Sequence, residues 1–139
     1  MKSRAKNAIR STVAIVAGCL TLLVTVGLIS IILGIVYPKA FPAVGTLPSI
    51  PWAMFLLIWS LISAVLAAYI TSLICVGSRV RHVFGLMIAI LALGLLFLAA
   101  NIYKQPTWYL IAQTVVWGVG AMIGGSVPVL GKDPRGNQS

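Results

Sequence analysis

Four long apolar segments, each free of Asp, Glu, Lys, Arg and His, constrain this chain more than any other feature of its sequence. They cover about residues 11–36, 52–76, 83–102 and 108–130, and each contains at least 20 residues. An α-helix rises about 1.5 Å per residue, so each segment is long enough to cross the roughly 30 Å hydrocarbon layer of a bilayer. The pattern therefore predicts four transmembrane segments.

Helices explain these segments better than strands do. Many of the residues are Val, Ile and Thr, which favour strands in water. In lipid, however, backbone N–H and C=O groups must form hydrogen bonds with one another, which only a helix or a closed barrel allows. Long apolar runs without alternation do not fit barrel strands. The connections Gly77–His82 and Tyr103–Thr107 are short, so they should join antiparallel neighbours. We predict an all-α membrane protein, a four-transmembrane-helix antiparallel bundle over residues 11–130.

The regions outside the predicted helices differ from one another in composition. Residues 1–10 are predicted to be a basic cytoplasmic tail, and residues 131–139 a disordered polar one. The first connection, Tyr37–Pro51, contains four prolines, which cannot continue a helix. We therefore expect an ordered extracytoplasmic loop that lies against the outer ends of the helices.

The distribution of cations predicts the orientation. Eight basic residues fall on one side of the predicted membrane: Lys2, Arg4, Lys6, Arg10, Arg79, Arg81, Lys132 and Arg135. The other side has only Lys39 and Lys104. Loops rich in Lys and Arg stay in the cytoplasm, so both termini should be cytoplasmic. Several aromatic residues near the opposite boundary agree with this orientation, since Trp and Tyr favour membrane interfaces.

Small residues recur on the predicted helices at spacings that place them on one face. The second helix carries Ser60, Ala64, Ala68 and Ser72; the fourth carries Gly118, Gly120, Gly124 and Gly125; the first offers Gly27, Ser30 and Gly34. In lipid, small residues let helix backbones approach closely, which supplies much of the association energy. These faces would pack within the bundle, or against a second copy or a partner subunit. Because one chain offers few partners, we expect at least one of the two stripes on the second and fourth helices to face outward.

Polar residues within or beside the predicted helices are few. Gln113 and Asn101 should lie at similar depth, either bonded to each other across two helices or in contact with a ligand. Arg79 and Arg81 are expected to contact anionic lipid phosphates, with His82 beside them.

The two cysteines leave alternatives open. Val16-Ala17-Gly18-Cys19 matches a lipoprotein cleavage pattern, but the apolar run continues far beyond Cys19. Cys75 lies near the cytoplasmic end of the second helix, where palmitoylation or redox chemistry would be the alternatives to simple packing. For both cysteines, the favoured interpretation is a small packing residue.

Several classes of function lack the residues that they need. Proton-coupled transport requires ionisable groups within the membrane, whereas the only acid is Asp133 in the C-terminal tail. Catalysis, metal binding and haem ligation require clustered His, Asp, Glu or Cys, and His82 is the only histidine. The +9 formal charge lies outside the apolar runs and forms no basic groove for nucleic acid. We therefore predict no enzymatic activity, no cofactor or metal, and no nucleic-acid partner.

A group of motifs in the second half of the chain resembles a known type of protein. The motifs are the basic turn Gly77-Ser-Arg-Val-Arg-His82, the segment Pro106-Thr-Trp108-Tyr109 and the closing Gly-Ala-Met-Ile-Gly-Gly125. Over roughly residues 60–126 the chain is similar to small four-span inner-membrane proteins of bacteria whose function is uncharacterised. The resemblance implies four helices in a bacterial plasma membrane, and it implies no activity.

Two hypotheses about function follow. The favoured one is a non-catalytic membrane protein, either an accessory or scaffold subunit of a larger complex or a protein that assembles with itself. The alternative is a passive binder or transporter of an apolar or neutral small molecule, in which Gln113, Asn101 and the outer aromatic residues make the contacts. Membrane lipids are expected partners in either case.

Overall fold

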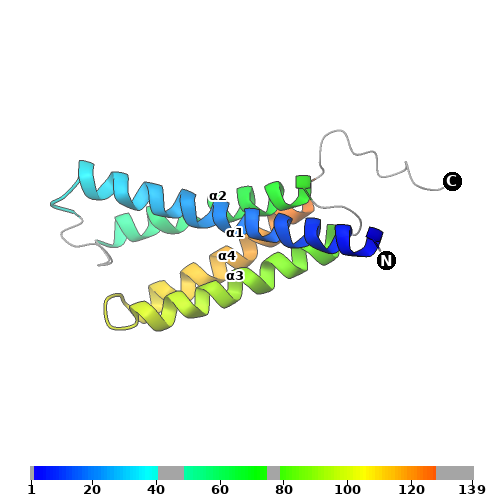
Figure 1. Ribbon diagram of the computed structural model, residues 1–139. Coiled ribbons are helices and arrows are strands. Elements are labelled where there is room, and N and C mark those ends of the chain that lie inside the picture. Colours follow the sequence, from blue (N-terminus) through cyan, green and yellow to red (C-terminus); the bar gives the residue numbers. More distant parts are fainter. Residues whose placement is uncertain (1, 41–48, 75–78, 128–139) are drawn as a thin grey trace.

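The computed structural model describes residues 2–40, 49–74 and 79–127. Within these residues the chain is helical and contains no strand. The helices are α1 (Lys2–Val36), α2 (Ile50–Ile74), α3 (Arg79–Asn101) and α4 (Thr107–Ser126), drawn in Figure 1. All four are long and apolar enough to cross a membrane. The prediction of four helices of membrane-spanning length is therefore confirmed.

All four helices begin earlier than the apolar pattern predicts, α1 and α3 by the most, and α4 ends at Ser126 rather than near Leu130. α1 begins at Lys2 rather than near Ser11, and α3 begins at Arg79 rather than near Val83. Neither extension contains Gly or Pro, and the polar residues in it are compatible with helix. Loss of hydrophobicity marks where a helix leaves lipid, not where its backbone hydrogen bonds end. The predicted basic tail and basic turn are therefore largely helical.

Prolines mark the starts of α2 and α4. Pro51 lies in the first turn of α2, where its missing N–H breaks no intrahelical bond. The carbonyl of Ser49 accepts hydrogen bonds from the backbone N–H groups of Trp52 (3.0 Å) and Ala53 (3.1 Å). Pro106 has extended backbone angles (φ −60°, ψ 133°) directly before α4. The centre of the predicted loop, Cys75 and the C-terminal tail lie outside the described residues.

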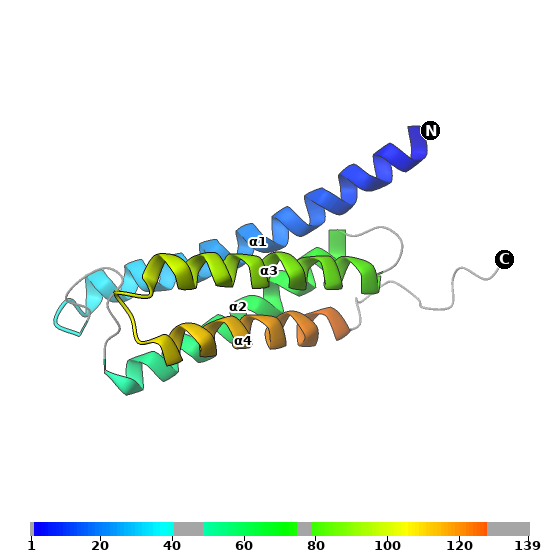
Figure 2. The same cartoon turned by 90° about the horizontal axis from the view of Figure 1, so that it is seen from below.

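The helix contacts do not follow the order of the chain. α2 makes its most extensive contact with α4, and α2 also packs on α1, while α3 packs mainly on α4. Gly120 lies against Leu61 and Ala64, and Gly124 against Val65, so α2 and α4 run in the same direction. The short connection predicts α2 and α3 as close neighbours, yet this pair makes less contact than any other pair of described helices that touch. Figure 2 shows α1 crossing the other helices, with its first turns projecting beyond them.

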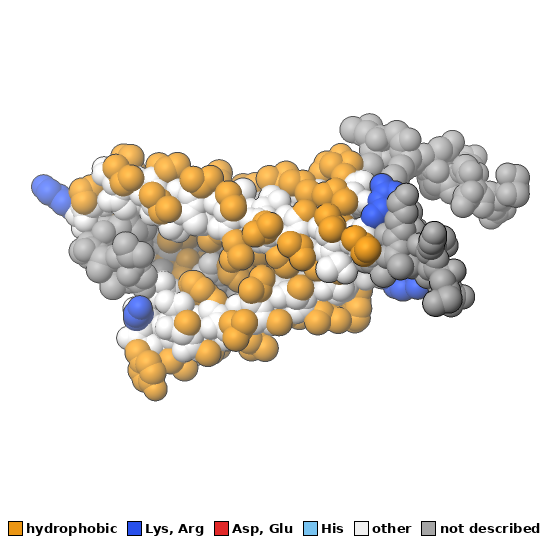
Figure 3. Space-filling view, in the orientation of Figure 1, with side chains coloured by type: hydrophobic (Ala, Val, Ile, Leu, Met, Phe, Trp, Pro, Cys, Tyr) orange, Lys and Arg blue, Asp and Glu red, His pale blue; other side chains and the backbone are white. Residues whose placement is uncertain are grey.

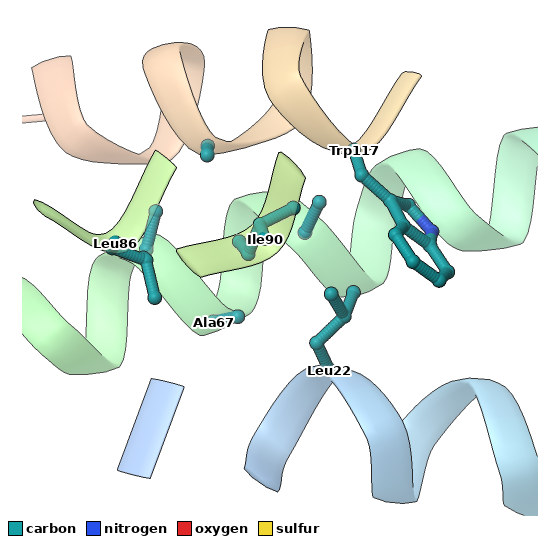
Figure 4. Close-up of a cluster of buried hydrophobic side chains, with 8 residues drawn as sticks. Leu22, Ala67, Leu86, Ile90 and Trp117 are labelled. Atoms are coloured by element: carbon teal, nitrogen blue, oxygen red, sulfur yellow. The ribbon is translucent and has the colours of Figure 1, made fainter. Parts of the chain in front are cut away.

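One apolar core cluster draws on all four helices. It consists of Leu22, Ala64, Ala67, Ala68, Leu86, Ile90, Trp117 and Ala121, several of which are labelled in Figure 4. A smaller cluster of Ala53, Tyr109 and Leu110 joins α2 to α4 nearer their first turns. Small residues from α2 and mostly large ones from the other helices fill the centre, and α2 packs most extensively on α4 and α1.

Apolar side chains cover the outside of the helices, and charged ones lie at the ends. Figure 3 shows hydrophobic side chains along the visible face and Lys and Arg side chains at its two ends. Arg10 and Arg81 are exposed at one end, while Lys39 and Lys104 are exposed at the other. An apolar belt between two polar ends matches the profile of a bilayer.

Candidate functional site

Helices α2 and α4 approach each other closely at two glycines. A Cβ atom built on Gly120 would lie 2.9 Å from the Leu61 carbonyl oxygen and 2.6 Å from the Ala64 Cβ. A Cβ atom on Gly124 would lie 2.9 Å from the carbonyl carbon of Val65, and closer still to its oxygen. A side chain at either position would force the backbones apart. The G-x-x-x-G pair is therefore occupied by a contact within the chain.

The small-residue stripe of α2 is also buried within the chain. Its members, Ser60, Ala64, Ala68 and Ser72, are at most 1% exposed. A second row on α2 faces α1, where a Cβ atom on Gly18 would lie 3.1 Å from the Ala67 carbonyl oxygen. The Thr71 hydroxyl donates to the carbonyl of Ala14 (3.1 Å) and to that of Ala67 (3.0 Å). α2 thus carries one small-residue face for each of two neighbours.

The expectation that at least one of these two stripes faces outward is wrong. Gly120 and Gly124 pack on α2, and the α2 stripe is buried. The prediction failed because it counted only neighbours joined by short turns. The parallel pair of α2 and α4, which are separated by α3 in the chain, satisfies both stripes at once.

The remaining glycines of α4 contact α3. A Cβ atom on Gly125 would overlap the Val83 side chain, whereas one on Gly118 would make an ordinary contact of 3.7 Å with Leu91. Gly94 of α3 lies equally close to Thr114 of α4, where a Cβ atom would be 2.7 Å from the threonine methyl group. Gly118 is thus the one predicted α4 glycine whose small size the chain itself does not require.

The glycines of α1 divide into two groups. Gly18 is buried against α2 and α3, whereas Gly27 and Gly34 have open space in the direction of a Cβ atom. Ser30, between them, is exposed and donates to the carbonyl of Val26 within its own helix (2.9 Å). The predicted small-residue face of α1 is therefore left uncovered by the described residues, whereas the stripes of α2 and α4 are covered.

Gly18 is a packing residue that sequence reasoning missed. It appears in the sequence analysis only within the motif that precedes Cys19. Ala14 and Gly18 are four residues apart, which is the same small-residue spacing that identified the other helices. Applying that pattern uniformly along α1 would have found the contact.

Gln113 and Asn101 do not form the predicted interhelical bond. Asn101 donates through Nδ2 to the carbonyl of Phe97, one turn back on its own helix (2.9 Å). Gln113 is 4% exposed, and its Oε1 atom is buried without a hydrogen-bond partner. Leaving a buried acceptor unpaired costs about 1–3 kcal/mol. Gln113 is therefore an unusual feature of the interior, whereas Asn101 is not.

Two tryptophans also differ in whether their indole N–H group has a hydrogen-bond partner. Trp59 of α2 donates through Nε1 to the carbonyl of Thr25 in α1 (3.1 Å), which ties the two helices together. Trp117 of α4 is 3% exposed, and its Nε1 atom is buried without a partner. Its ring contacts Phe97 of α3, with the centroids 6.2 Å apart. Neither indole was a candidate in the sequence analysis, because an apolar run does not reveal which of its aromatic residues point inward.

At the basic end, α1 and α3 are joined by a hydrogen bond between Ser11 Oγ and His82 Nε2 (2.6 Å). His82 is buried, whereas Arg81 is exposed and free to reach a membrane surface. Arg79 is the first residue of α3. The histidine therefore belongs to the helix contact and not to an exposed basic turn.

The described residues offer little for covalent chemistry. They contain no group of three or more His, Cys, Asp or Glu residues placed to hold a metal ion. Cys19 is half-buried and packs against the core cluster of all four helices. What the interior does offer is hydrogen bonding by neutral groups, and the exterior offers apolar surface.

Comparison with known proteins found no relative of this chain. No family model matches the sequence, and no curated protein or solved structure is significantly similar to it. The helices alone define the class, which is that of multi-pass membrane proteins.

Proposed function

We propose that the protein is a non-catalytic component of a bacterial inner membrane that works by association, either as an accessory or scaffold subunit or by assembling with itself. In this proposal the helices form an antiparallel bundle with both termini in the cytoplasm. The asymmetry of eight basic residues against two supports the orientation. The choice of a bacterial membrane rests on the motifs of residues 60–126 that resemble small four-span bacterial proteins.

The uncovered face of α1 carries the association hypothesis. Only 11% of the apolar stretch of α1 is buried within the chain, against 44% for α4. Gly27 and Gly34 lie on this face, seven residues or about two helical turns apart, and no described residue lies within 4 Å of a Cβ atom built on either one. Glycine in a helix is about 1 kcal/mol less favourable than alanine. Close approach of another helix would offset that cost, whereas lipid would not.

The interaction test compares leucine substitutions on two exposed surfaces. Two copies of the protein with different affinity tags are co-expressed, extracted in mild detergent and purified through one tag. We expect stoichiometric recovery of the second copy or of a defined membrane partner, and at least tenfold less recovery for Gly27→Leu/Gly34→Leu. Ala92→Leu, at an exposed small residue of α3, is the matched control and should behave as wild type. A monomeric wild-type protein without a stoichiometric partner would contradict the proposal.

The alternative function, passive binding or transport of an apolar or neutral molecule, is favoured by the unpartnered amide of Gln113. It predicts a monomer whose interior binds a ligand. The outcome of the two-tag purification separates it from association, because an interior site does not depend on Gly27 or Gly34.

A further inference from the structure

Gln113 and Trp117 bring two unpartnered polar atoms into one region of the interior. They are four residues apart on α4 and so lie on the same helix face. Side chains in a helix lean towards its N-terminus, so the indole of Trp117 covers the turn that carries Gln113. In Figure 4 the indole nitrogen lies on the edge of the ring turned away from Leu22 and Ile90.

We propose that Gln113 and Trp117 form a binding site for a single neutral hydroxyl group, supplied by water or by a small hydroxylated solute. The two unpartnered atoms are complementary, since Gln113 Oε1 accepts and Trp117 Nε1–H donates. A hydroxyl oxygen accepts from the indole while its proton is donated to the amide. One guest thereby satisfies both buried atoms.

The surroundings define the size and charge of the guest. Apolar clusters lie on either side along α4, with Tyr109 and Leu110 before Gln113, and Ala121 after Trp117. The apolar segments that contain these residues carry no Asp, Glu, Lys, Arg or His, so no counter-charge is available for an ion. Both polar atoms are inaccessible to solvent in this conformation. The guest is therefore small, and the flexible Gln113 side chain changes rotamer to admit it.

Another tryptophan supplies an internal control. Trp59 Nε1 already donates to a backbone carbonyl, so its indole proton has a protein partner. A site for an external hydroxyl should distinguish Trp117 from Trp59, although both tryptophans lie within apolar helices. This distinction does not depend on whether the protein assembles with others.

The test uses the full chain labelled with ¹⁵N-tryptophan in lipid nanodiscs. The four indole signals are assigned by Trp52→Phe, Trp59→Phe and Trp108→Phe, which leave Trp117 intact. We expect a nuclear Overhauser contact between the Trp117 indole proton and water, or a saturable contact to added ethanol or glycerol, and none for Trp59. Contact with water alone identifies water as the guest, and replacement of that contact by the added alcohol identifies a solute site.

A substitution at Gln113 tests whether one guest binds to both Gln113 and Trp117. In Gln113→Met, which keeps the length of the side chain, the contact at Trp117 should weaken at least fivefold and the midpoint of thermal unfolding should fall. Absence of any contact with water or alcohol at Trp117 in the wild-type protein overturns the proposal. A rise in the unfolding midpoint of Gln113→Met also overturns it, because removing a truly unpaired amide relieves a cost.

Discussion

At the scale of single residues, glycine has opposite roles in different helices of this protein. Gly120 and Gly124 allow the backbone of α2 to come close, whereas Gly27 and Gly34 face open space. The same residue type therefore marks a completed contact on α4 and an uncovered surface on α1. Only the surrounding atoms separate the two cases.

Alanine substitutions on α4 test the completed contact. Gly124→Ala should lower the stability of the folded protein by about 1–3 kcal/mol, because the added methyl group overlaps the backbone of Val65. Gly118→Ala is the control: its methyl group has room, and alanine favours helix by about 1 kcal/mol. Thermal unfolding in detergent, followed by intrinsic fluorescence, measures both. Equal stability of the two variants would contradict the close contact of α2 with α4.

The indole of Trp59 provides a second test at this scale. Trp59→Phe removes the hydrogen bond to Thr25 while it keeps an aromatic ring against α1. Interhelical hydrogen bonds in membranes contribute about 0.6–2 kcal/mol, so a loss of stability in this range is expected. Trp108→Phe, at an exposed position, should change stability less. An unchanged unfolding curve for Trp59→Phe would show that this bond does not hold α1 to α2.

At the scale of helices, α1 packs on the bundle along one side and leaves another side open. Its contacts include the bond from Thr71 to Ala14, the close approach at Gly18, the bond from Ser11 to His82 and the bond from Trp59 to Thr25. Near its C-terminus, Tyr37 contacts Trp52 of α2, with the ring centroids 5.2 Å apart. Such an arrangement leaves the open side available to another helix.

The Ser11–His82 bond should control local opening of α1 more than global stability. Ser11→Ala keeps good helix propensity and removes one bond that contributes about 0.6 kcal/mol. We therefore expect about threefold faster amide hydrogen exchange near residues 9–15, with little change in the unfolding midpoint. Ser30→Ala, which removes only a bond within α1, should leave exchange in that region unaltered. Unchanged exchange in Ser11→Ala would show that other contacts hold the start of α1.

The sequence predicts the helices of this fold better than it predicts their neighbours. An apolar run of 20 or more residues needs no partner to become a helix in lipid, so four helices follow from hydropathy alone. Helix ends were less accurate, since polar residues such as Lys2 or Arg79 continue a helix as readily as they end one. The spacing of Gly120 and Gly124 correctly indicates a close contact, but periodicity identifies a face and not the helix opposite it.

The polar interior illustrates the same limit. Gln113 stands out in the sequence because it interrupts an apolar run, whereas Trp117 looks like any other apolar residue. The importance of Trp117 depends on two properties: its indole N–H is buried, and that N–H has no hydrogen-bond partner. Neither property follows from spacing. Asn101, which also stands out in the sequence, bonds to its own helix.

At the scale of the whole molecule, α2 is the centre and charge is confined to the ends. α2 packs on both α1 and α4, while α3 packs mainly on α4 and makes smaller contacts with α1 and α2. Apolar side chains lie along the face seen in Figure 3, between ends that carry Lys and Arg. This distribution underlies the central claim that the chain spans an inner membrane four times with both termini in the cytoplasm.

Labelling of cysteines from outside intact cells tests that claim most directly. Cys19 and Cys75 are replaced by alanine, and a single cysteine is introduced by Lys104→Cys or by Arg81→Cys, both at exposed positions at opposite ends of α3. A membrane-impermeant maleimide should label Lys104→Cys in intact cells, and should label Arg81→Cys only after the inner membrane is permeabilised. Labelling of Arg81→Cys in intact cells, with Lys104→Cys protected, would contradict the orientation; labelling of both would contradict a membrane-spanning α3.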